Sequence, residues 1–141
     1  MDLGLGGKAA LVTGGSEGIG RAVARKLAEE GVRVAICART KATLRETATE
    51  IIKATGVEVI PLPADLRALA GCQGFVAERA ARLGRVDIPV NNAGASAFGP
   101  FVDPPDEAFV DAIQGTLLGY IRCAEAVTPH MRQRGGVIVN A

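Results

Sequence analysis

Short apolar runs alternate with segments of helical periodicity along the chain. Residues 9–13 form an apolar run closed by glycines, and residues 21–30 then place apolar side chains at the three- and four-residue spacing of a helix face. The succession recurs, and it predicts further strands at 32–38, 57–62, 86–90 and 137–140, and helices at 41–55, 67–83 and from 106 to about 134. Strands that alternate with helices form right-handed βαβ units and hence a parallel sheet covered on both faces.

The predicted fold is therefore α/β, a doubly wound parallel sheet of about five strands and four helices, in one domain over residues 1–141. Three residues fit this pattern poorly. Gly71 and Gly74 weaken the third helix, and Pro89 removes a hydrogen-bond donor from the fourth strand.

Composition agrees with such a sheet and excludes several classes of function. Hydrophobic residues make up 48% of the chain and tryptophan is absent, so Val, Ile, Leu and Ala must fill the core. The net charge of +1 comes without a basic stripe, and we expect no nucleic-acid partner. Three separated cysteines predict neither a disulfide framework nor a metal site. The chain shows no leader-like or membrane-spanning apolar stretch, and we expect a cytoplasmic protein without membrane contact.

The loop after the first predicted strand is a candidate binding site for a pyrophosphate. It reads TGGSEGIG over residues 13–20 and leads directly into a helix. Backbone N–H groups at a helix N-terminus, without side chains in the way, form a site for a pyrophosphate. Gly14 permits the tight turn and Gly20 the close packing of helix on strand. The alternative is an ordinary glycine-rich turn.

Three motifs in order resemble the short-chain dehydrogenase/reductase family. They are TGGSEGIG at 13–20, ADL at 64–66 and VDIPVNNAG at 86–94, and each stands at the end of a predicted strand. The spacing GxxxGxG departs from the general GxGxxG pattern of dinucleotide folds and agrees with this family. The resemblance extends through all 141 residues. It implies a Rossmann-type fold and an NAD(P)-dependent oxidoreductase.

The resemblance also assigns cofactor contacts. Asp65 and Leu66 would meet the adenine ring, residues 92–94 would lie at the adenosine ribose, and Asn91 would tie strands together; a plain turn is the other interpretation of NNAG. With the glycine-rich loop, the full set of candidate cofactor-binding residues is Gly14, Ser16, Glu17, Gly18, Ile19, Gly20, Arg39, Asp65, Leu66, Asn92, Ala93 and Gly94.

Arg39 decides the expected cofactor. An acidic residue at the end of the second strand binds the ribose 2′-OH of NAD, whereas an arginine there accommodates the 2′-phosphate of NADP. Ala38 and Arg39 occupy this place, and no carboxylate follows until Glu46. NADP is therefore expected in preference to NAD. A solvated loop charge is the alternative for Arg39, and Glu17 would repel a nearby phosphate.

The family's catalytic residues have no match here. The family uses a Tyr-x-x-x-Lys pair that follows its fifth strand, but the only tyrosine, Tyr120, precedes Ala124. Thr116 stands where the family has an asparagine, and the only histidine, His130, complements a helix dipole. We therefore expect no catalytic residue in this chain, which resembles the family's N-terminal part, truncated before its serine, tyrosine and lysine.

Two classes of function remain open. The first is the NADP(H)-binding part of an enzyme that reduces a ketone or oxidises a secondary alcohol, inactive as this chain alone. The second is a non-catalytic nucleotide-binding or assembly module; a non-functional truncated gene product is a third possibility. A homo-oligomer is expected through the exposed edge strand or the long helix. Phe98 and Phe101 suit either a partly apolar substrate or ordinary loop packing.

Overall fold

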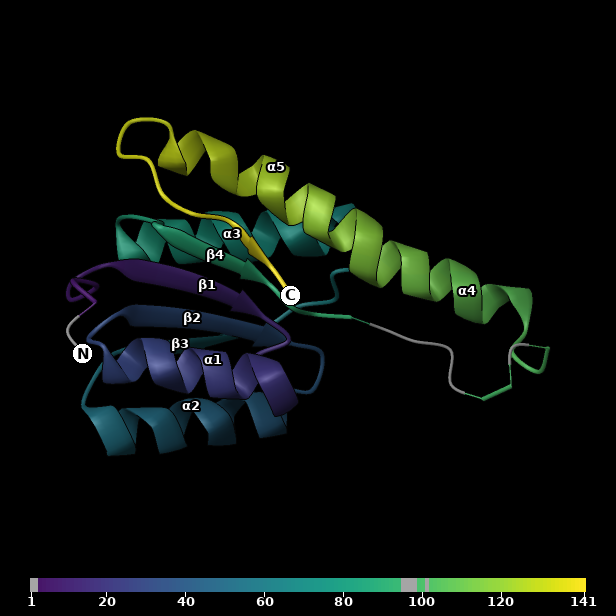
Figure 1. Cartoon of the computed structure of the whole chain (residues 1–141), viewed down its shortest axis with the longest axis horizontal. Helices are drawn as coiled ribbons and strands as arrows, with labels where there is room; N and C mark the ends of the chain where they lie inside the picture. The colour runs from purple at the N-terminus through teal and green to yellow at the C-terminus, as the bar shows by residue number, and fades with distance from the viewer. Residues whose placement is uncertain (1–2, 95–98, 101) are drawn as a thin grey trace.

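A five-stranded parallel sheet forms the centre of the molecule (Figure 1). The structure is a computed structural model, and it describes residues 3–94, 99–100 and 102–141, so that Phe98 and Phe101 lie outside the described residues. The sheet order is β3-β2-β1-β4-β5. The strands are β1 (Ala9–Thr13), β2 (Arg33–Ala38), β3 (Val59–Pro63), β4 (Ile88–Asn91) and β5 (Val139–Asn140).

Helices cover both faces of this sheet. Figure 1 shows α1 and α2 together on one face, and α3 and α5 on the other. The helices are α1 (Gly18–Glu29), α2 (Lys41–Thr55), α3 (Leu69–Leu83), α4 (Asp106–Ala112) and α5 (Gly119–Met131), with a π-helical segment η1 (Ile113–Leu118) that joins α4 to α5. The doubly wound parallel sheet predicted from the sequence is therefore confirmed.

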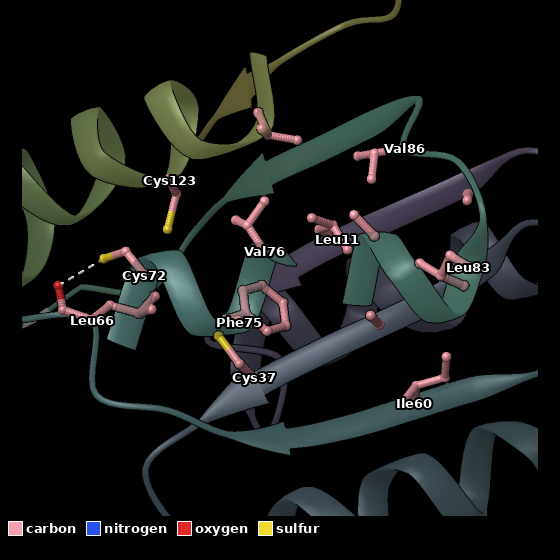
Figure 2. Close-up of a cluster of buried hydrophobic side chains, with 14 residues drawn as sticks. Leu11, Cys37, Ile60, Leu66, Cys72, Phe75, Val76, Leu83, Val86 and Cys123 are labelled. Carbon is pink, nitrogen blue, oxygen red and sulfur yellow. Dashed lines mark hydrogen bonds between the residues drawn. The ribbon is translucent and has the colours of Figure 1, made fainter. Parts of the chain in front are cut away.

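Alternate residues of the central strands enter two separate cores. Leu11 of β1 packs with Phe75 and Val76 of α3, whereas its neighbour Val12 packs in the other cluster with Leu44 of α2. Figure 2 shows the first cluster, between the sheet, α3 and α5. Because side chains on a strand point alternately to the two faces, a strand between two helical layers must be apolar at every position. This is why β1 is buried along its whole length.

Two positions that fit the sequence pattern poorly have a place in the fold. A Cβ on Gly71 would collide with the carbonyl oxygen of Asp65, so glycine allows the first turn of α3 to pack against the chain that leaves β3. Pro89 lies within β4 opposite Leu11 of β1, and the next residue, Val90, still pairs with Val12. The pairing of β4 with β1 therefore continues past the missing donor.

Helix boundaries differ from the predictions where a side chain intervenes. Helix α3 begins at Leu69 and not at residue 67, because the backbone N–H of Arg67 donates to the Asp65 carboxylate at 3.0 Å in a turn. The long helix was expected to be regular from 106 to about 134, but its centre is the π-helical η1. Gly115 and Gly119 have low helix propensity, and a Cβ on Gly119 would lie 3.3 Å from the Leu66 carbonyl oxygen.

Candidate nucleotide-binding site

The carboxyl ends of β1 to β4 surround a cavity of about 370 Å³. The chain reverses its direction of winding between β1 and β4, and ligands of open α/β sheets bind in the crevice at such a switch point. Most of the predicted site residues line the cavity: Gly14, Ser16, Glu17, Arg39, Asp65, Leu66, Asn92, Ala93 and Gly94. It is also lined by Cys37, Ala38, Thr40, Ala64, Arg67 and Gly115, which sequence reasoning did not assign.

Gly18, Ile19 and Gly20 are not part of the cavity lining, because they form the first turn of α1 beside it. Gly18 has a φ of +52° with open space in front of its missing side chain, and Ile19 is 69% exposed. In the described part of the chain, no side chain caps the N-terminus of α1. The first backbone N–H groups of this helix are therefore open to an anion.

Two glycines bring the first loop close to its neighbours. Gly14 has a φ of +66°, and a Cβ there would lie 2.9 Å from the Cα of Ala93. A Cβ on Gly20 would collide with the Gly14 carbonyl oxygen. The loop can fold against the residues that follow β4 only because both positions lack a side chain, as the sequence predicted for the turn and for the packing of helix on strand.

Thr13 fastens the glycine-rich loop to the NNAG turn. Its hydroxyl oxygen accepts hydrogen bonds from the backbone N–H groups of Asn92 and Ala93, both at 2.9 Å. The Asn92 side-chain amide donates in return to the carbonyl oxygens of Thr13 at 3.1 Å and Gly14 at 3.4 Å. Thr13 is 3% exposed, so these bonds are shielded from water. These reciprocal contacts fasten together the turns that follow two neighbouring strands, and sequence reasoning assigned no role to Thr13.

Asn91 holds strands and the long helix together. Its side-chain amide donates to Oδ1 of Asn140 in β5 at 2.9 Å and to the Tyr120 carbonyl in α5 at 3.5 Å. The expectation that Asn91 ties strands together is thus confirmed.

An ion-paired cluster forms the wall of the cavity after β3. The Arg67 guanidinium donates to both carboxylate oxygens of Asp65, with Nη2 at 2.8 Å from Oδ2. These hydrogen bonds lower the pKa of Asp65, and the nearby Arg39 adds a smaller effect in the same direction. Arg39 itself is exposed and makes no ion pair with any described residue. The sequence signal for Arg67 was its place two residues after an acid at a strand end.

Tyr120, His130 and Thr116, which were not assigned to cofactor binding, lie outside the cavity lining. Tyr120 is half-buried, donates from its hydroxyl to the Ala141 carbonyl at 2.8 Å, and has its pKa raised by burial. His130 is exposed in the last turn of α5. Thr116 stands beside the NNAG turn, where a Cβ on Gly94 would lie 3.4 Å from its hydroxyl oxygen.

The cysteines are buried free thiols, as expected for small apolar side chains. Burial raises the pKa of Cys37 to about 12, and Figure 2 shows the Cys72 sulfur directed at the Leu66 carbonyl, to which it donates at 3.3 Å. Among the residues described, no cluster of His, Cys, Asp and Glu could hold a metal ion. None of the described helices combines the length and apolarity that crossing a membrane requires.

The comparisons with known proteins point to one family. The family described as short chain dehydrogenase matches residues 8–141. The 3-oxoacyl-(acyl-carrier-protein) reductase FabG of Staphylococcus epidermidis is 39% identical over 134 residues, which cover 94% of this chain and 55% of that protein. The chain thus spans about half the length of the curated relatives it matches.

Solved structures agree in fold as well as in sequence. L-Sorbose reductase from Gluconobacter frateurii, complexed with NADPH and L-sorbose, superposes with a TM-score of 0.93 at 33% identity, over 99% of this chain and 54% of that one. An NAD⁺-bound xylitol dehydrogenase gives a TM-score of 0.89 at 32% identity, over 96% of this chain and 53% of its own. From its strand order, its glycine-rich loop and these matches, the chain belongs to the short-chain dehydrogenase family.

Proposed function

We propose that residues 1–141 form one dinucleotide-binding domain, the NADP(H)-binding part of an oxidoreductase that reduces a ketone or oxidises a secondary alcohol. The observation that carries the proposal is the cavity between the uncapped start of α1 and the exposed Arg39. It offers backbone N–H groups for a pyrophosphate at one end and a guanidinium at the other. We assign the cofactor contacts to the residues predicted from the sequence.

The residues present fit a dinucleotide. Gly14 and Gly20 leave no room for a Cβ between the loop, the helix and the NNAG turn, and Gly18 presents only backbone toward open space. A pyrophosphate needs this kind of close backbone approach. Bound NADP(H) would supply the hydride chemistry, while this part of the chain would bind and orient the cofactor.

NADP is proposed in preference to NAD on the basis of Arg39. The second strand ends at Ala38, so no carboxylate stands where NAD enzymes bind the ribose hydroxyls. The L-sorbose reductase complexed with NADPH supports this choice, whereas the NAD⁺-bound xylitol dehydrogenase shows that the fold accepts either cofactor. Glu17 lines the same cavity and opposes the binding of a phosphate. The Arg39 guanidinium, free of any described ion pair, outweighs it in this proposal.

We propose that none of residues 1–141 acts as the proton donor to the substrate. In the family a lysine four residues after the tyrosine favours the phenolate, but Ala124 takes that position after Tyr120. The pKa of Tyr120 is raised by burial, which is the opposite of what a phenolate needs. We therefore expect this 141-residue chain to bind NADPH without reducing ketones.

The experiment that tests the function measures binding and turnover together. The 141-residue chain is titrated with NADPH while the cofactor fluorescence is followed, and NADPH oxidation is then monitored over a panel of aliphatic, aromatic and 3-oxoacyl thioester ketones. Saturable binding with no oxidation above the protein-free rate is the expected result. Clear turnover would place catalytic residues within the chain, and lack of NADPH binding would contradict the cofactor assignment.

Arg39→Asp should reverse the cofactor preference. The carboxylate would repel the 2′-phosphate of NADPH and accept hydrogen bonds from the ribose of NADH, so we expect the ratio of the two dissociation constants to shift toward NADH by about 100-fold. Arg45→Asp changes an exposed arginine of α2 to the same residue and serves as the control. The assignment of Arg39 fails if Arg39→Asp prefers NADPH by the wild-type margin.

One observation favours self-association of the chain in addition to cofactor binding. Exposed apolar side chains follow one face of the long helix at three- and four-residue spacing: Val110, Ile113, Leu117 and Ile121, which are 53%, 51%, 57% and 45% exposed. Such a stripe is typical of a helix that packs on a partner. We propose a homo-oligomer through this helix. Light scattering on the chain used for the NADPH titration distinguishes a defined oligomer from a monomer.

A further inference from the structure

Arg39 and Arg67 share one cavity with Asp65 but differ in their contacts. Arg39 has no ion-pair partner among the described residues, whereas Arg67 pairs with Asp65 and with Asp111. An ionised carboxylate beside a free arginine would ordinarily attract it. Asp65 nevertheless forms its ion pair with Arg67 and none with Arg39.

The contacts of the Arg67 guanidinium explain this choice of partner. Its Nε donates to Oδ1 and Oδ2 of Asp65 at 3.1 and 3.2 Å, and its Nη2 to Oδ2 at 2.8 Å. Its Nη1 donates to Oδ2 of Asp111 in α4 at 3.0 Å, so two carboxylates hold the planar guanidinium from two directions. The Arg67 carbonyl accepts a hydrogen bond from Nη1 of Arg122 at 2.9 Å, which fixes the backbone as well.

The pairing changes the charge that a ligand meets in the cavity. Asp65 is 44% exposed in its side chain, and without a partner its negative charge would face the same space as Arg39. There it would either pair with Arg39 or repel a phosphate bound to it. With Arg67 in place, the Asp65 charge is balanced within its own turn, and Arg39 remains available.

Resting on the proposed NADP(H) function, we propose that Arg67 is a positioning residue that sets cofactor specificity. It holds and neutralises Asp65, and thereby reserves Arg39 for the 2′-phosphate of NADP(H). Asp111 contributes by holding the guanidinium from the side of α4. Arg67 does not contact the phosphate in this scheme, because its donors are directed at the two carboxylates.

The test uses rescue by a second substitution. Dissociation constants for NADPH and NADH are measured by fluorescence titration on the 141-residue chain. In Arg67→Met we expect the preference for NADPH over NADH to fall about ten-fold, because the unpaired Asp65 competes for Arg39. In Arg67→Met/Asp65→Asn the competing charge is gone, and we expect the preference to return to within about two-fold of wild type. Any adenine contact of Asp65 is common to NADPH and NADH, so its loss cancels in the ratio of the two dissociation constants. A merely structural role of Arg67 would not be restored by removing Asp65.

Two further variants complete the test. Arg82→Met removes an exposed arginine near the other end of α3, 3.5 Å from Glu58, and should leave the preference unchanged. Arg67→Lys keeps the positive charge but loses the planar guanidinium that contacts both carboxylates, so it should lose part of the preference. Adding Asp65→Asn to Arg67→Lys should restore that part, which tests the idea even if Arg67→Met does not fold.

Two kinds of failure can be told apart. A wild-type chain that does not bind NADPH, or does not prefer it to NADH, overturns the proposed cofactor and this inference with it. A wild-type chain that prefers NADPH overturns this inference alone if Arg67→Met or Arg67→Lys keeps the full preference, or if adding Asp65→Asn does not restore what either variant lost.

Discussion

In the Gly18→Val variant we expect the affinity for NADPH to fall at least about 100-fold. Gly18 is the first residue of α1, and the space in front of its missing side chain is open. A valine there would stand over the uncapped backbone N–H groups that are proposed to hold the pyrophosphate. NADPH titration of the folded variant measures the effect.

A matched substitution separates obstruction of the site from backbone strain. Gly18 has a φ of +52°, so valine also strains the backbone there. Gly84 has a φ of +72°, faces open space and ends α3 just before β4, at the edge of the sheet opposite the strand ends that form the cavity. Gly84→Val therefore imposes similar strain away from the site. The pyrophosphate assignment is wrong if Gly84→Val weakens NADPH binding as much as Gly18→Val does.

Thr13→Val should lower the free energy of unfolding by about 2–3 kcal/mol. Valine has nearly the shape of threonine, so packing is preserved while the backbone N–H groups of Asn92 and Ala93 lose their acceptor. Leaving buried donors unsatisfied costs their full desolvation penalty. Urea denaturation of the 141-residue chain, with the slope checked for two-state behaviour, measures this change.

Two controls make the Thr13 result specific. Thr13→Ser keeps the hydroxyl and should cost less than Thr13→Val, although it loses a buried methyl group. Thr128→Val removes an exposed hydroxyl that donates only to its own helix at the Ala124 carbonyl, and should change stability by less than about 0.5 kcal/mol. If Thr13→Val unfolds at the same urea concentration as wild type, the link between the two loops is not a source of stability.

The predicted secondary structure was confirmed because its signals are local. The strand β1 is apolar up to its last residue and β2 is apolar after Arg33, and α2 spans residues 41–55, as its periodicity and its closing glycine indicated. The alternation of strands and helices left little choice of topology, since parallel crossovers are right-handed. The glycines of the first loop were also readable from the sequence, because only glycine tolerates their conformation and close approach.

The differences arose where polar side chains or close contacts, local or distant, override the hydrophobic pattern. The π-helical η1 in the long helix was not predicted, because Gly119, directly after it, approaches the Leu66 carbonyl in the chain that leaves β3, far away in the sequence. The pairing of Arg67 with Asp65, two residues away, could have been considered from the sequence, but its second partner Asp111 is 44 residues away. Hydrophobic periodicity carries no information on such polar pairs.

The sequence by itself determined the parallel sheet, the glycine-rich turn after β1 and the place of Arg39 at the end of β2. Each depends on residues close together in the chain, whose backbone preferences act locally. Only the tertiary structure decided that Thr13 holds the NNAG turn, 79 and 80 residues away, and that Arg67 occupies Asp65 and leaves Arg39 uncommitted. The reason is geometric, because hydrogen bonds and ion pairs form between groups that the folded chain brings within about 3 Å of one another.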